Sequence, residues 1–184
     1  MNKLFSNIFI LIFITFLGSC QTNRDKVLAF GNKKIIPSQT GKNITMFYSD
    51  STILKIKLIT PLMLMYDKGV KEPFTVLPNG VFVKFFEDGK ESTSLKGNYA
   101  IRYEITQKMI IKYNVEIINL KGEKLNTESL VWDEQKRKIT TDAYVKITTA
   151  KEEITGTGLE ANQDFTQYEI KNVIGKINIE ENDL

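Results

Sequence analysis

Few residues of this chain could carry out acid–base, nucleophilic or metal chemistry. The 184 residues contain no histidine and a single cysteine, Cys20, which excludes Ser-His-Asp and Cys-His catalytic groups and metal sites built from imidazole or thiolate. Carboxylates remain, and Glu128, Asp133 and Asp142 could pair as general acid and base. Each lies near a predicted turn or on the polar face of a predicted strand, where carboxylates are normally solvated. We therefore expect no enzyme activity, no metal and no cofactor.

The composition is that of a soluble domain with a hydrophobic core. Hydrophobic residues make up 42% of the chain and charged residues 26%, which is ordinary for one folded domain. The formal net charge is +3, and the basic residues are spread singly rather than clustered as in nucleic-acid-binding proteins. The sequence therefore predicts no nucleic-acid partner.

The N-terminus has the pattern of a bacterial lipoprotein signal. An apolar run over residues 8–17 is followed at once by small residues and Cys20, the arrangement in which the cysteine becomes the acylated first residue of an exported protein. An uncleaved membrane helix is the alternative, although the run is short for a span. We expect a signal peptide over residues 1–19, a lipid anchor at Cys20, and an acylated N-terminus and polar tether over residues 20–36.

The elements that position the remaining residues are β-strands, because apolar side chains recur at every second position. The clearest unit is a β-hairpin. Its first strand runs into a turn at residues 120–123, and its second strand leaves the turn and ends at Trp132. The apolar residues that share one face of its first strand are Met109, Ile111, Tyr113, Val115 and Ile117. This alternation predicts a hairpin with one covered face.

Similar stretches predict further strands on both sides of this hairpin. They cover residues 44–48, 54–58, 62–66, 81–86, 95–104 and 139–149, with more between 154 and 179. Pro61 is expected to interrupt the ladder because it has no backbone donor, and the run 62–66 is expected to be a strand buried on both sides. Residues 67–80, which contain two glycines and two prolines, are expected to form a loop. The whole is an all-β chain of about a dozen strands in stacked antiparallel hairpins, with no helix after the signal.

Three ordered motifs in the second half of the chain resemble the LptC family of lipopolysaccharide export proteins. They are Asn119-x-x-Gly122-x-x-Leu125-x-Thr127-Glu128-x-Leu130-x-Trp132, then Ile139-x-Thr141-Asp142-x-x-Val145, then Gly156-x-Gly158-Leu159-x-Ala161-x-x-x-Phe165. The similarity extends from about Pro37 to Ile179. It implies an open, twisted β-jellyroll over residues 37–184, in which two sheets form a V and shelter the acyl chains of lipopolysaccharide between them.

The resemblance also implies a function without bond chemistry. Members of the family take lipopolysaccharide from an inner-membrane ABC transporter and pass it to a periplasmic bridge protein, LptA. Enterobacterial members are held by an uncleaved helix, whereas this chain is similar to the lipoprotein-type members. The family role predicts attachment to the periplasmic face of the inner membrane, while Gln21 after Cys20 would direct a lipoprotein to the outer membrane under enterobacterial sorting rules.

Candidate groove residues are apolar and alternate along the predicted strands. They are Leu54, Ile56, Leu58, Val83, Phe85, Ile111, Tyr113, Val115, Ile117, Val145 and Ile147. Each could equally be closed core, since periodicity identifies a face but not its occupant. Unpaired edge strands recruit strands of other proteins. We expect the edge around Gly175, Ile177 and Ile179 to meet the bridge protein, and the strand 44–48 to face the transporter.

Two other functions fit parts of the pattern. A β-rich envelope lipoprotein that acts as a scaffold or chaperone would share the anchor and the alternation, but its interior would be closed. A glycan hydrolase would need two carboxyl groups that face each other across a cleft.

Overall fold

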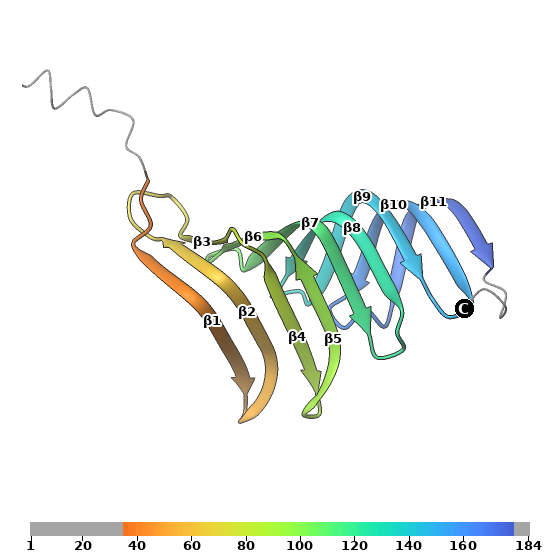
Figure 1. Ribbon diagram of the computed structural model, residues 1–184, viewed down its shortest axis with the longest axis horizontal. Coiled ribbons are helices and arrows are strands. Elements are labelled where there is room, and N and C mark those ends of the chain that lie inside the picture. Colours follow the sequence, from red (N-terminus) through yellow and green to blue (C-terminus); the bar gives the residue numbers. More distant parts are fainter. Residues whose placement is uncertain (1–34, 179–184) are drawn as a thin grey trace, which may run out of the picture. The chain divides into compact units, whose positions relative to one another are not determined.

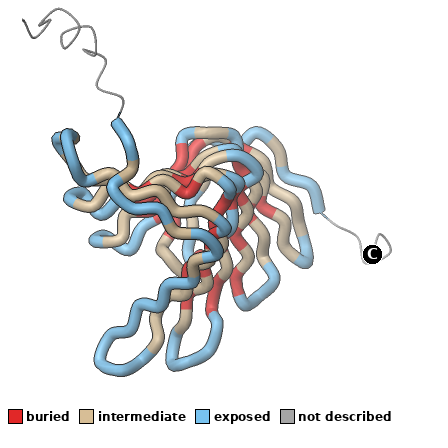
Figure 2. The backbone as a smooth tube through the Cα atoms, turned by 60° about the vertical axis from the view of Figure 1, so that its left-hand side comes forward, coloured by how far each residue is buried: buried red, intermediate tan, exposed pale blue. Residues whose placement is uncertain are grey.

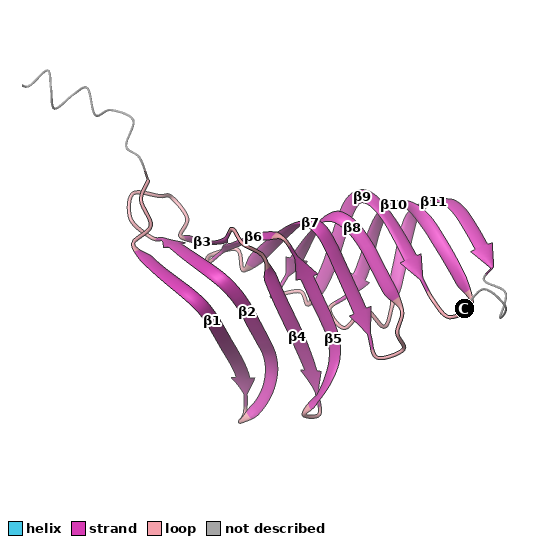
Figure 3. Ribbon diagram, viewed as in Figure 1, coloured by secondary structure: helices cyan, strands magenta, loops and turns pink. Residues whose placement is uncertain are grey.

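Residues 35–178 are described by the computed structural model of the chain. They form eleven strands in one continuous antiparallel sheet, and no helix occurs among them (Figure 3). The strands are β1 (Gln39–Asp50), β2 (Ile53–Tyr66), β3 (Phe74–Leu77), β4 (Val81–Glu87), β5 (Lys90–Gly97), β6 (Tyr99–Tyr103), β7 (Lys108–Asn119), β8 (Lys124–Asp133), β9 (Lys138–Thr148), β10 (Glu152–Asn162) and β11 (Tyr168–Asn178). The all-β prediction is confirmed.

The sheet is bent into two halves whose inner faces meet, as in a β-jellyroll. β2 and β7 run through both halves, and a different pair of strands lies between them in each half. The first half contains β4 and β5 between β2 and β7, whereas the second half contains β3 and β6. β1 and β11 are the strands at the two ends of the sheet (Figure 1). The two predicted sheets are therefore two halves of one hydrogen-bonded sheet.

Each long strand passes from one half to the other at an irregular point. In β7 this point is Tyr113–Asn114, where both residues have positive φ and the pairing with β8 shifts. The pairing of β8 with β9 and of β9 with β10 shifts at neighbouring positions. Bulges of this kind bend a strand and increase its twist. Together they form the crease of the V.

Buried threonine side chains satisfy backbone carbonyls at this crease. Thr60 Oγ1 donates to the carbonyl of Gly80 at 2.8 Å, and Thr127 Oγ1 donates to that of Tyr144 at 2.8 Å. Thr141 Oγ1 donates to the carbonyl of Ser129 at 2.6 Å. Buried carbonyls need such partners where a bulge interrupts the ladder. The side-chain hydrogen bonds thus replace the ladder bonds that the bend removes.

The core lies between the two halves (Figure 2). Its members come from β2 to β10 and from the loop after β10, and the largest fully buried side chains include Trp132, Phe165, Leu95, Met109 and Ile111. The end strands contribute least, because β1 and β11 are mostly exposed along their length. The core therefore closes the middle of the sheet and leaves its two ends less covered.

The structure confirms one prediction about β2 and corrects another. Pro61 interrupts the pairing with β1 as expected, because Pro61 and Asn43, whose φ is 50°, do not pair, although β2 continues through this point. The run Leu62–Tyr66 is half-buried rather than covered on both sides. A proline is tolerated where the missing donor would face an irregular partner.

Two predicted boundaries are also wrong. Residues 67–80 include a short strand, β3, which pairs with β2 and β6. Residues 95–104 form two strands rather than one, because the chain leaves β5 at Asn98 and enters β6 in the other half of the sheet. The alternation of side chains alone does not reveal this change of half.

Candidate functional site

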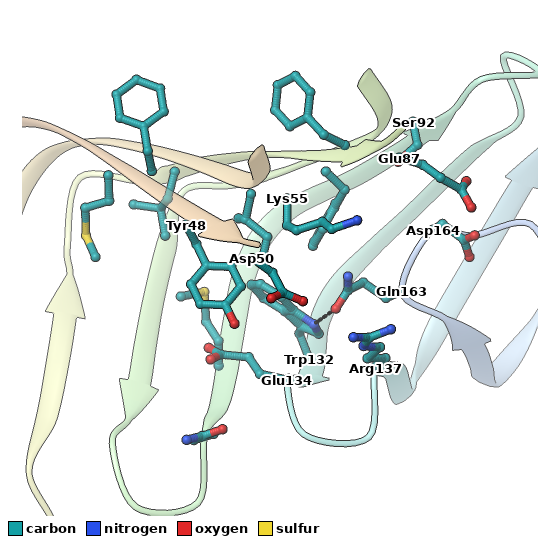
Figure 4. A pocket seen from close by; sticks show the side chains of 18 of the residues that line it. Tyr48, Asp50, Lys55, Glu87, Ser92, Trp132, Glu134, Arg137, Gln163 and Asp164 are labelled. Carbon is teal, nitrogen blue, oxygen red and sulfur yellow. Dashed lines mark hydrogen bonds between the residues drawn. The ribbon is translucent and has the colours of Figure 1, made fainter. Parts of the chain in front are cut away.

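A cavity of about 960 Å³ opens between the two halves of the sheet near β1 (Figure 4). One wall is formed by β1, β2, β4 and β5, and the other by β6, β7 and β8 with the turns and loops beside them. The volume is at the upper end of the range for small-molecule sites. We take this cavity as the candidate functional site.

The deep part of the cavity is apolar. Leu58 and Phe85 from the first half face Met109 and Trp132 from the second half, and all four are buried. Nearer the opening, β1 adds Met46, Phe47 and Tyr48, which are 49%, 63% and 60% exposed. Exposed apolar side chains that continue a buried apolar surface mark a ligand or partner site.

Charged side chains surround this apolar floor in near balance. The lining includes three basic residues, Lys55, Arg102 and Arg137, and four acidic ones, Asp50, Glu87, Glu134 and Asp164. Such a balance gives little attraction for a ligand of either charge. Apolar contact is therefore the main recognition that the cavity offers.

Arg102 is held in place by a network of carboxylates. Its Nε and Nη2 donate to Glu134 at 2.7 and 2.9 Å, and Nη1 donates to Glu104. The hydrogen bonds to Glu134, assisted by those to Glu104, raise the pKa of Arg102 above its ordinary value, while burial opposes this rise. The guanidinium is thus already paired, and it stiffens the wall of β6 and β8 rather than offering a free cation.

The structure divides ten of the eleven predicted groove residues into three groups. Ile56, Leu58 and Phe85 line the cavity, and Leu54 lies half-buried on the same strand as Ile56. The fully packed residues within the core are Val83, Ile111, Val115, Ile117, Val145 and Ile147. These six can contact a lipid only if the two halves separate, and their assignment to the groove stays a prediction.

Tyr113 does not share the face of its neighbours. It is 56% exposed and contacts Tyr99, with ring centroids 6.3 Å apart. The reason is the bulge at Tyr113–Asn114, which interrupts the alternation of β7 before it resumes with Val115 buried. The expected face is therefore correct for Met109 and Ile111 and wrong for Tyr113.

Several residues that line the cavity were not among the groove residues predicted from the sequence. Met109 and Trp132 follow the same alternation as the predicted groove residues, so the apolar pattern could have identified them. Met46, Phe47 and Tyr48 are consecutive and show no alternation. Their position at the end of the sheet could not be inferred from period-two patterning.

The three carboxylates considered for acid–base chemistry lie outside this cavity. Asp142 is exposed and accepts a hydrogen bond from Lys171 at 2.8 Å. Asp133 caps a turn by accepting from the backbone N–H of Lys136 at 3.0 Å, and Glu128 is exposed in β8. Each has a surface or turn role, so the arrangement of these three gives the hydrolase alternative no support.

The two end strands have the exposure expected of interaction edges. In β11, Ile177 is 65% exposed and Val173 is 61% exposed, while Gly175 is partly covered. Ile179, which was grouped with this edge, lies outside the described residues. The assignment of this edge and of strand 44–48 to particular partners stays a prediction.

The predicted signal peptide, Cys20, Gln21 and most of the tether also lie outside the described residues. Within residues 35–178, no helix is long and apolar enough to cross a membrane. The same residues contain no group of three or more metal-ligating side chains placed to hold an ion.

One comparison with known proteins identifies a family. The sequence model of the family described as "Lipopolysaccharide-assembly, LptC-related" matches residues 11–177, which is most of the chain. No curated protein matches the chain.

Proposed function

The chain belongs to the LptC family, a family of lipopolysaccharide transport proteins, and we propose that it shelters lipopolysaccharide acyl chains in the cavity between the two halves of its sheet. The observation that carries this proposal is the apolar floor of that cavity, which is open near β1. Recognition by apolar contact suits a ligand whose buried part is hydrocarbon.

The energy of hydration explains why such a shelter is needed. Burying one methylene is worth about 0.8 kcal/mol, so exposing a twelve-carbon acyl chain to water costs on the order of 9 kcal/mol. Lipopolysaccharide carries several such chains. Because hydrophobic contact has no preferred direction, chains held in this way can slide onward if the next surface is similarly apolar.

We further propose the direction of this transfer. The protein receives lipopolysaccharide from the inner-membrane ABC transporter at the β1 end and passes it to an LptA-like bridge protein at the β11 end. Support comes from the two exposed edge strands at opposite ends of the sheet, since such edges can extend a sheet into a neighbouring protein. A lipid anchor at Cys20 would hold the protein at the periplasmic face of the inner membrane, and two or three acyl chains make such attachment lasting.

A photo-crosslinking residue tests the proposal in living cells. Substituted at Met46, on the cavity wall, it should capture lipopolysaccharide only while the transporter hydrolyses ATP. The same residue at Tyr113, which is exposed outside the cavity lining, should capture much less. Equal capture at both positions, or none at Met46, would reject the proposal and leave a scaffold or chaperone lipoprotein as the better reading.

A further inference from the structure

The loop between β10 and β11 spans the space between the two halves of the sheet. On the side of the first half, Thr93 Oγ1 donates to the carbonyl of Asp164 at 2.6 Å. Asn119 Nδ2, at the end of β7, donates to the carbonyl of Phe165 at 2.8 Å and is buried. Both bonds join strands of the first half to a loop that starts from the second half.

The same loop is held to the second half by two more hydrogen bonds. The Trp132 indole N–H donates to Gln163 Oε1 at 3.1 Å, as Figure 4 shows. The backbone N–H of Gln163 donates to the carbonyl of Arg137 at 3.0 Å. The loop therefore acts as a strap that joins the two halves.

Phe165 fills the space beneath this strap. Its side chain is 0% exposed and stacks on Tyr168, with ring centroids 4.9 Å apart. Its φ is 52°, a backbone conformation that bulky residues rarely adopt. Residues kept in such a conformation often belong to switch or clamp regions.

The cavity stops at this loop. Asn162, Gln163 and Asp164 line its wall, whereas Phe165 belongs to the closed core. Beyond Phe165 toward β11, the interior is filled by residues such as Leu159 and Ile170. A ligand in the cavity cannot reach the β11 end while Phe165 and the residues behind it stay packed.

We propose that the loop 162–167 is a gate and that Phe165 is its moving part. Displacement of the loop breaks the bonds from Thr93 and Asn119 that join the two halves, so that the halves can separate beyond Phe165 and an acyl chain can pass from the β1 end to the β11 end. This inference rests on the proposed function. It adds that the passage of an acyl chain through the protein is blocked at Phe165 until the loop moves.

The construction of the loop suits movement as a unit. Asn162 Oδ1 accepts from the backbone N–H groups of Thr166 and Gln167 at 3.0 and 2.9 Å, and Asn162 Nδ2 donates to Thr166 Oγ1. These bonds lie within the loop and do not depend on the first half. The bonds from Thr93 and Asn119 can therefore break without disturbing the turn itself or the pairing of β10 with β11.

A reversible lock tests the gate. Residues 35–178 contain no cysteine, so Thr93→Cys with Asp164→Cys would form one disulfide across the strap, with its formation checked by gel mobility. A photo-crosslinking residue is placed either at Met46, in the cavity, or at Ile170, beyond Phe165. Oxidation should leave lipopolysaccharide capture at Met46 unchanged and reduce capture at Ile170 at least tenfold. Reduction of the disulfide should restore it, and capture by each single-cysteine chain should be the same before and after oxidation.

The outcomes separate the gate from the proposed function. Capture at Ile170 that is unaffected by the lock overturns the gate, whereas loss of capture at both positions without any lock overturns the proposed function. A milder variant, Thr93→Val, removes only the hydrogen bond to Asp164 and should raise the rate of capture at Ile170 about fivefold, the usual equivalent of one hydrogen bond. Thr140→Val, on half-buried β9 surface, is its matched control and should change nothing.

Discussion

Phe85 and Trp132 meet edge to face across the interior, with ring centroids 5.0 Å apart and planes at 84°. Phe85 belongs to β4 in the first half of the sheet, and Trp132 belongs to β8 in the second half. Both are buried and both line the cavity. This pair is therefore where the two halves touch at the deep end of the site.

A double-mutant cycle measures that contact. Phe85→Leu and Trp132→Phe should each lower the free energy of unfolding, and their effects should be non-additive by about 0.5–1.5 kcal/mol, the usual value for an aromatic pair. Urea unfolding provides the four free energies. Phe82→Leu, on the opposite face of β4, should be additive with Trp132→Phe. Additivity of both pairs would mean that the halves do not meet at Phe85.

The crease threonines predict a second effect on stability. Thr141→Val keeps the shape of the side chain but removes the donor to Ser129 at 2.6 Å and the acceptor for the Ala143 N–H at 3.0 Å. Leaving these buried groups without a partner should cost about 1–3 kcal/mol of unfolding free energy. Thr140→Val, the neighbour on the other face of β9, should cost much less. Similar losses for the two variants in urea unfolding would contradict the role of Thr141.

Period-two alternation was sufficient to predict the strands and most of the core, because burial of one face imposes it. It failed at Tyr113 and Asn98, where the chain bends or changes half. These features depend on backbone conformation at single residues and on partners distant in sequence. Neither leaves a signal in hydrophobic patterning.

The candidate site was harder to predict than the fold. Ile56, Leu58 and Phe85 were identified, but the pattern could not separate them from packed residues such as Val83 or Val145. All of them are apolar and alternate in the same way. What distinguishes the cavity is that β4 and β5 lie opposite β6 and the ends of β7 and β8, a relationship set by tertiary topology.

A glycine is needed at position 156 for a steric reason. A Cβ at Gly156 would lie 2.5 Å from the Asn172 carbonyl oxygen and 2.5 Å from Ile170 Cγ2. Gly156→Ala should therefore push β11 away from β10, at a cost of about 1–3 kcal/mol. Hydrogen exchange should become faster at the paired amides of β11. Gly175→Ala meets only the Thr155 hydroxyl, at 3.1 Å, and should have a smaller effect; equal exchange in the two variants would contradict the steric explanation.

Glu116 predicts a dependence of stability on pH. Its carboxylate lies 2.7 Å from Lys96 Nζ and 3.2 Å from Lys124 Nζ. The hydrogen bond from Lys96, together with that from Lys124, lowers the pKa of Glu116, and burial opposes the shift. The ionised group therefore stabilises the fold above the ordinary glutamate pKa, and this contribution is lost as the pH falls through the lowered value.

Glu116→Gln should thus be less stable than the original chain at pH 7, and the two should converge as the pH falls through the lowered pKa of Glu116 and the carboxylate becomes protonated. Thermal unfolding over this pH range checks the expectation. Glu169→Gln, at an exposed position of β11, is the control and should follow the original chain throughout. A difference for Glu116→Gln that persists at low pH would point to packing rather than charge.

The edge of β11 predicts an effect on assembly. Ile177→Pro introduces a residue without a backbone donor into an exposed end strand, and a proline there prevents the strand from pairing on both sides. Under the proposed function, co-purification with the bridge protein should be lost. Ile177→Val keeps the donor and the β-branched shape, so it should retain the complex. A thermal midpoint close to that of the original chain would show that the proline variant is folded.

The opposite edge makes the direction of transfer testable in the same experiment. Phe47→Pro in β1 should leave the bridge complex intact and weaken association with the transporter, because β1 and β11 are at opposite ends of the sheet. If Phe47→Pro releases the bridge protein and Ile177→Pro does not, the edges are assigned in the wrong order. If neither proline changes either association, strand pairing at these edges does not hold the complex together, and the side chains exposed on the faces of β1 and β11 must do so instead.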